Sequence, residues 1–218
     1  MRESVKDFLH NARQAVVLTV VLMLVCGLLF PALMTGASSL IFPHQAAGSL
    51  ITAGDKTIGA EHVGQEFTED YYMWGRPSPY HYNVYNEDDR GVQTYTDGSA
   101  FPGIGSGSNN YGPSNPELAK RVEADIKDFL EKNPGVKRGD IPTDLLTASG
   151  SGLDPHISPA SAEIQVPRIA VASGLTEEAV KEIISRGTEG KLLGIFGEET
   201  VNVLKVNIEI ARAMGIME

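Results

Sequence analysis

The feature that most constrains this chain is a long uncharged segment near its N-terminus. No Asp, Glu, Lys or Arg occurs between Arg13 and Asp55. Within that gap, residues 15–34 read AVVLTVVLMLVCGLLFPALM. At a rise of about 1.5 Å per residue, roughly twenty helical residues cross about 30 Å, which is the thickness of a bilayer's hydrocarbon core. The segment therefore predicts a single membrane-spanning helix, which we assign to residues 15–36.

One detail of this segment leaves an alternative open. The small residues 35–37 (Thr-Gly-Ala) would suit cleavage of a signal peptide. The apolar run is longer than the roughly 7–15 residues usual for a signal peptide, so we favour a retained anchor. Pro31 lies near its outer end and is expected to kink or end the helix.

The charges that flank the segment predict its orientation. Arg2, Lys6 and Arg13 precede it, and the next basic residue is Lys56. Basic residues near a membrane span stay on the cytoplasmic side. We therefore expect a cytoplasmic tail at residues 1–14 and an extracytoplasmic domain at residues 37–218, in a single-pass protein of the cell membrane that contacts the lipid bilayer.

Composition separates the rest of the chain from the apolar segment. Asp55 and the residues after it include 15 of the 18 Lys and Arg residues and 26 of the 28 Asp and Glu residues. The net charge of that part is therefore −11. Such an acidic surface argues against a nucleic-acid partner. The length is ample for one hydrophobic core.

Residues 49–111 show two different patterns. Residues 49–63 predict a β-hairpin, because Gly54 and Asp55 supply a turn between two short apolar runs. Residues 67–111 carry ten of the fifteen aromatic residues among many Gly, Pro, Asn and Asp. We interpret them as a long, irregular but ordered surface region, because flexible linkers lack aromatic residues.

The remaining residues predict three or four helices and a short strand. Asn115-Pro116-Glu117 is typical of a helix start, and residues 133–135 (Asn-Pro-Gly) end that helix. Ser158-Pro159 starts a second helical stretch that Pro167 should bend and Gly174 should end. Thr176 opens a third helix, whose buried face is Val180, Ile183 and Ile184. For residues 200–210 we favour a short strand followed by a helix over strand alone, and the expected fold class is α+β.

A search for catalytic chemistry finds little. The five His residues form no metal-binding motif, so no metal site is expected. Residues 149–152 (Ser-Gly-Ser-Gly) could form a nest for an anion or a tight structural turn, and we favour the turn. Asp154 and His156 could belong to a hydrolase triad, but residues two apart in a Pro-containing turn seldom face each other. We expect them to form a bend that caps the following helix.

Two longer motifs resemble a known family. Residues 105–116 (GSGSNNYGPSNP) and residues 147–159 (TASGSGLDPHISP) are similar to the C subunit of the bacterial Kdp-type potassium-transporting ATPase, the KdpC family. Residues 75–78 (Gly-Arg-Pro-Ser) and 201–204 (Val-Asn-Val-Leu) support the resemblance. Residues 80–104 are longer and more acidic than the usual form.

The resemblance implies a non-catalytic subunit of an ATP-driven potassium uptake complex. The subunit would act in assembly and as a catalytic chaperone that raises the ATP affinity of the ATPase subunit. Its partners would be a potassium-channel-like subunit, a P-type ATPase subunit and a small membrane subunit. No firmly bound cofactor is expected, and ATP would be reached through the ATPase subunit. Any ATP contact would fall on Ser149, Gly150, Ser151, Gly152 and Asp154, and we expect subunit contacts at Arg76, Asn109, Ser114, Asn115 and His156.

The predicted orientation disagrees with part of this implication. It places Ser149–Asp154 outside the cell, whereas ATP is inside. We therefore favour the assembly role over direct nucleotide contact. Two alternatives remain: a membrane-anchored extracellular hydrolase using His156, and an extracellular binding module using residues 67–111.

Overall fold

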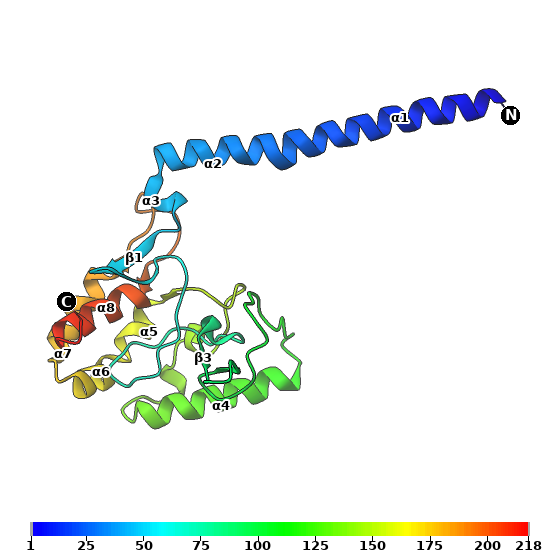
Figure 1. Ribbon diagram of the computed structural model, residues 1–218. Helices are drawn as coiled ribbons and strands as arrows, with labels where there is room; N and C mark the ends of the chain where they lie inside the picture. Colours follow the sequence, from blue (N-terminus) through cyan, green and yellow to red (C-terminus); the bar gives the residue numbers. More distant parts are fainter. Residues whose placement is uncertain (1, 218) are drawn as a thin grey trace. The chain divides into compact units, whose positions relative to one another are not determined.

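A computed structural model describes residues 2–217, and it divides the chain into two compact units, residues 1–50 and residues 51–218 (Figure 1). The first unit is a long helical run. It consists of α1 (Arg2–Leu24), a π-helical turn η1 (Val25–Leu29), α2 (Phe30–Ile41) and the short α3 (Pro43–Ala46). Its stretch His10–Ile41 is long and apolar enough to cross a membrane, with a hydropathy of 2.8 in its most apolar window and none of that window buried.

Of the two effects expected of Pro31, a kink or an end, the structure excludes the end, because the helix continues to Ile41. Proline lacks an N–H and its ring clashes with the carbonyl one turn earlier, so it disturbs a regular α-helix. Here the π-helical turn comes directly before it, and the Phe30 N–H donates to the Val25 carbonyl five residues back. The wider turn lets the helix continue through the proline.

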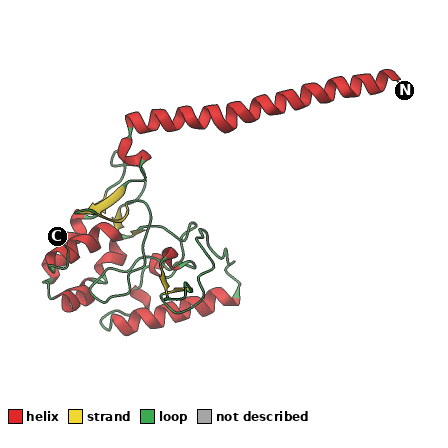
Figure 2. Cartoon of the chain, viewed as in Figure 1, coloured by secondary structure: helices red, strands yellow, loops and turns green. Residues whose placement is uncertain are grey.

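The second unit mixes helices with short antiparallel strands, so the predicted mixture of α and β structure is confirmed. Figure 2 shows that helices and loops dominate it. Two hairpins are formed, and the third sheet has the order β5-β7-β6, with Val201 of β7 opposite Ile157 on one side and Thr188 on the other. The strands are β1 (Leu50–Ala53), β2 (Lys56–Ala60), β3 (Tyr85–Glu87), β4 (Gln93–Tyr95), β5 (His156–Ile157), β6 (Thr188–Glu189) and β7 (Thr200–Asn202).

The helices of this unit enclose one hydrophobic core. They are α4 (Pro116–Lys132), α5 (Pro159–Glu163), α6 (Val166–Ser173), α7 (Glu177–Arg186) and α8 (Val203–Ala213), with short 3-10 turns at His81–Asn83, Arg138–Asp140 and Thr143–Leu145. Figure 1 shows α5–α8 gathered together. Ile169 of α6, Val180 of α7 and Val206 of α8 are fully buried between them, and α4 adds Ile126 and Phe129 to the same core.

The helix starts lie where the capping residues predicted them. The Asn115 side chain accepts a hydrogen bond from the Glu117 N–H at 2.9 Å, and the Ser158 hydroxyl accepts from the Ser161 N–H at 3.1 Å. Thr176 caps α7 in the same way. The β1–β2 hairpin and the predicted order of strand β7 followed by helix α8 are also confirmed.

The second helical stretch is divided rather than simply bent. Helix α5 ends at Glu163 and α6 begins at Val166, so Pro167 lies in the first turn of a new helix, where its missing N–H costs nothing. Gly174 ends α6 in the left-handed conformation, with φ of 75°, as predicted.

Residues 67–111 differ from the expected surface region at one important point. They are irregular apart from the 3-10 turn His81–Asn83 and the small β3–β4 hairpin, but the Met73 side chain is fully buried. The Asn207 side chain of α8 holds the Met73 backbone on both sides: its Oδ1 accepts from the Met73 N–H at 2.7 Å, and its Nδ2 donates to the Met73 carbonyl at 2.9 Å. A remote helix therefore fixes this part of the loop in the core.

We predict that Asn207→Ala lowers the free energy of unfolding by about 3 kcal/mol, because two buried backbone groups of Met73 lose their partners. Urea unfolding of the full chain in detergent, followed by the fluorescence of Trp74, the only Trp, measures it. The exposed Asn86→Ala is the matched control and should leave stability unchanged. Equal stability of the two variants would contradict the anchoring role of Asn207.

Candidate functional site

The two motifs that carry the family resemblance pack against each other. The Gly107 N–H donates to the Ser151 carbonyl at 2.6 Å, and the Ser106 hydroxyl donates to the same oxygen at 3.0 Å. Gly152 adopts φ of 66°, and a Cβ there would lie 2.4 Å from the Gly107 carbonyl oxygen. Glycine is therefore required at this position by both its conformation and the close approach of the two loops.

Hydrogen bonds within the domain occupy most of the backbone of residues 149–153. The Ser78 hydroxyl donates to the Gly152 carbonyl at 2.6 Å, and the Gly64 N–H donates to the Leu153 carbonyl at 2.8 Å. The N–H groups of Gly152 and Leu153 also bond internally, to Ser149 and Ser151. These bonds engage carbonyl groups of the segment and two of its N–H groups within the domain, which supports the interpretation of Ser-Gly-Ser-Gly as a tight structural turn.

Arg76 joins the irregular segment that follows β2 to the second motif. Its Nη1 lies 3.2 Å from Asp154 Oδ2, and its other nitrogens donate to the carbonyls of Thr147 and Ala148 at 3.2 and 3.4 Å. The planar guanidinium thus bonds three points of one loop with three separate nitrogens, whereas a lysine has a single nitrogen.

Asp154 and His156 face each other, so the expectation that they would not was wrong. Asp154 Oδ1 accepts from the His156 N–H at 3.0 Å, and this bond closes the turn and brings the imidazole Nδ1 to 3.4 Å from the same carboxylate. The hydrogen bond from the His156 side chain, helped by the Arg76 charge, holds the pKa of Asp154 below its usual value. The far ring nitrogen, Nε2, lies 3.4 Å from the Asn202 amide, where a hydrolase would have a serine.

Tyr82 packs against the site and bonds the backbone of Arg76. Its hydroxyl donates to the Arg76 carbonyl at 2.8 Å, and burial raises its pKa, so the phenol stays neutral. His81, Tyr82 and Asn83 all have positive φ, between 44° and 60°. Such a run costs conformational energy and persists only when its surroundings enforce it, as the bonds of Tyr82 do here.

The other residues expected to contact subunits lie around this network rather than in its hydrogen bonds. Asn109 is exposed and lines a cleft of about 450 Å³ together with Arg121 and Thr147. Ser114 is exposed at the start of α4, and the side chain of Asn115 is used as the cap of that helix. The structure therefore brings Arg76 and His156 together, with Asp154 between them, and leaves Asn109 and Ser114 on the surface.

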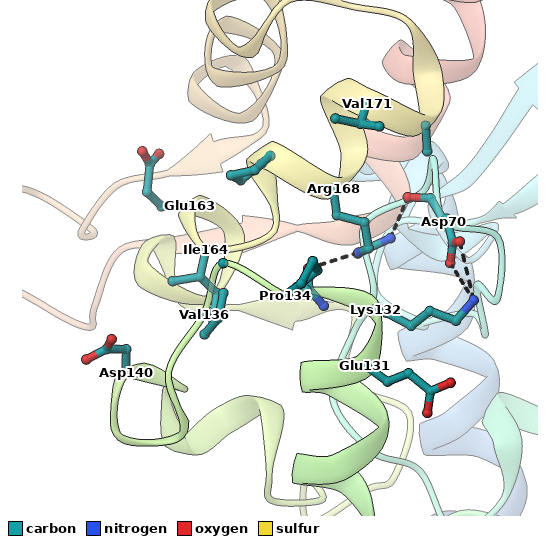
Figure 3. Close-up of a pocket in the computed structure, with 14 residues that line it drawn as sticks. Asp70, Glu131, Lys132, Pro134, Val136, Asp140, Glu163, Ile164, Arg168 and Val171 are labelled. Atoms are coloured by element: carbon teal, nitrogen blue, oxygen red, sulfur yellow. Dashed lines mark hydrogen bonds and ion pairs between the residues drawn. The ribbon is translucent and has the colours of Figure 1, made fainter.

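A second cavity, of about 650 Å³, lies beside α6 (Figure 3). Its wall includes the buried Arg168, which the sequence analysis missed, although a charged residue within the apolar run of residues 164–172 was the available signal. Arg168 donates to the Asn133 side chain at 3.1 Å and to the Tyr72 carbonyl at 3.0 Å, and it stacks 4.1 Å from the Trp74 ring. Burial lowers the pKa of Arg168 to about 10, so it remains charged and serves as a structural tie.

Over residues 2–217, no group of three His, Cys, Asp or Glu side chains is arranged to hold a metal ion.

Comparison with known proteins identifies the family. The family model described as "K+-transporting ATPase, c chain" matches residues 12–212. The chain belongs to the KdpC family. A potassium-transporting ATPase KdpC subunit of Clostridium kluyveri is 50% identical over 96% of this chain and 97% of its own length. The KdpC subunit of Clostridioides difficile is 49% identical over 96% of this chain and 100% of its own length. That of Bradyrhizobium diazoefficiens is 42% identical over 94% of this chain and 98% of its own length. The resemblance stated from the two motifs is confirmed.

For this KdpC family member we predict that Asp154→Asn lowers the free energy of unfolding by about 2 kcal/mol at pH 7, through the loss of charge-assisted hydrogen bonds. Because the pKa of Asp154 is lowered in the folded chain, its contribution is complete above the ordinary carboxyl pKa and is lost as the pH falls below it. The difference between wild type and variant should therefore shrink in acid. Urea unfolding at several pH values measures it, with the exposed Asp89→Asn as control; a difference that is constant with pH would contradict it.

Proposed function

We propose that this chain is the non-catalytic C subunit of an ATP-driven potassium-transporting ATPase complex in the cell membrane, and that it acts in assembly and stabilisation. The observation that carries the proposal is the family match over residues 12–212, together with relatives of nearly the same length that are named KdpC subunits. The apolar helix between His10 and Ile41 supports a membrane location.

The geometry around His156 supports a role without catalysis. Both of its ring nitrogens face groups that hold the loop, namely Asp154 and Asn202. Neither group supplies a nucleophile, so the hydrolase alternative gains no support from this site.

The partners proposed are a potassium-channel-like subunit, a P-type ATPase subunit and a small membrane subunit. In this arrangement residues 15–36 cross the bilayer, residues 1–14 are cytoplasmic and residues 37–218 lie outside. Arg2, Lys6 and Arg13 support this orientation. The exposed residues Asn109 and Ser114 are the proposed points of contact with other subunits.

The family resemblance also suggests that the subunit raises the ATP affinity of the ATPase subunit. Direct ATP contact would involve Ser149, Gly150, Ser151, Gly152 and Asp154. The internal hydrogen bonds of this segment favour an indirect effect, in which assembly stabilises the nucleotide-binding state of the partner.

Purification of the tagged chain in mild detergent tests the assembly role. We expect a channel-like subunit and a P-type ATPase subunit to accompany it. His156→Ala should either reduce this co-purification or change nothing, because the residue supports the fold of its loop. Recovery of the chain alone would contradict the proposal, and loss of turnover in a fully assembled His156→Ala complex would favour a catalytic role.

Protease added to intact spheroplasts tests the orientation. We expect residues 37–218 to be digested without lysis, since the proposed domain faces outward. Digestion only after lysis would reverse the orientation and would place Ser149–Asp154 on the side where ATP is present. A cytoplasmic marker protein that stays intact is the control for unbroken cells.

A further inference from the structure

An exposed apolar loop lies between β6 and β7. Leu192, Leu193, Ile195 and Phe196, called here the apolar tip, are 69, 81, 76 and 62% exposed. The other exposed large apolar residues of the second unit are scattered singly, which is normal for a soluble surface. Four in five consecutive positions form a patch that usually marks a binding surface.

The backbone of this loop is closed by hydrogen bonds and strained in its turn. Leu192 and Phe196 exchange two backbone hydrogen bonds, of 2.8 and 3.0 Å, which close a tight reversal of the chain. Leu193 has φ of 54° and is followed by Gly194 with φ of 73°. Leucine is unfavourable in this conformation, and its exposed side chain gains no packing in return. A bulky apolar residue held there at a cost points to a function outside the domain.

The loop begins at the edge of the domain where the chain enters it. Lys205 Nζ lies 2.5 Å from Glu61 and 2.8 Å from Glu189, so the residue after β2 and the last residue of β6 lie side by side. Strands β1 and β2 are joined by a two-residue turn, so the start of β1 lies beside the end of β2. Figure 1 shows the orange loop after β6 on the side of β1.

The start of β1 is also close in sequence to the candidate membrane helix. Leu50 follows Ile41 by nine residues. A chain of that length reaches at most about 30 Å even when fully extended, and the helical residues 37–41 add about 8 Å beyond the span assigned to residues 15–36. The edge that carries the apolar tip is therefore tethered near any membrane that holds the helix.

We propose that the apolar tip inserts into the interfacial region of the lipid bilayer that anchors the chain. This inference rests on the proposed membrane anchoring. The four side chains of the apolar tip lie on both arms and in the turn of the chain reversal. An apolar medium would cover all of them, whereas a flat protein surface would cover only some. Lys191 on one arm is offset by Glu198 and Glu199 on the other, so the attraction is apolar and does not require anionic lipid.

A depth measurement on the full chain tests the inference. In a Cys26→Ser background, Leu193→Cys carries the fluorophore NBD, and the chain alone is reconstituted into phosphatidylcholine vesicles. We expect quenchers placed on the lipid acyl chains to reduce its emission by about twofold or more, as for a side chain at the headgroup boundary. Val171→Cys, at a position 86% exposed on α6, is the matched control and should not be quenched. In a separate sample of the wild-type chain, NBD attached to Cys26 reports the depth of the membrane anchor.

The outcomes separate the inference from the proposed function. Quenching at Cys26 but not at position 193 would overturn the insertion of the apolar tip and leave the anchor intact. Protection of position 193 only in the complete complex would assign the tip to a partner subunit, which also overturns the lipid assignment. No quenching at Cys26 would instead contradict the membrane anchoring. Wild-type fluorescence of Trp74 in each variant shows that the domain is folded.

Discussion

The second unit depends on buried side-chain amides that bond the backbone of its irregular part. The Asn207 amide bonds both backbone groups of Met73, and the Gln165 amide bonds both backbone groups of Trp74, at 2.9 and 3.1 Å. Two consecutive loop residues are thus paired as they would be in a sheet, but by side chains from the helical region. Since an unpaired buried peptide group is costly, these two amides allow a long loop to enter the core without strands.

Charged side chains play a similar part in the candidate site, whose loops are irregular but held by hydrogen bonds. Arg76 holds the carbonyls of Thr147 and Ala148, while Asp154 holds the turn at His156. The bonds of Arg76 join segments more than seventy residues apart, and the bond of Asp154 closes a local turn. A surface built in this way keeps its shape without a large sheet beneath it, which suits a subunit whose proposed task is to be recognised by larger partners.

Much of the fold could be predicted from local signals. Asn115, Ser158 and Thr176 cap helices because the interaction needs only residues two or three positions away. The burial of Met73, the bonds of Arg168 and the pairing of Asp154 with His156 could not be predicted, because they depend on contacts across the chain or on the closure of one turn. The two loop motifs indicated the family correctly, but their physical reason, the close approach of Gly107 and Gly152, is visible only in three dimensions.

The π-helical turn before Pro31 has a consequence for the candidate membrane helix as a whole. One extra residue in a repeat of 3.6 rotates everything beyond it by about 100°. A row of side chains aligned along α1 therefore does not continue along α2 but reappears on another side of the cylinder. Neighbours at different depths of the bilayer would meet different faces of one helix, so a single span can present two separate contact stripes.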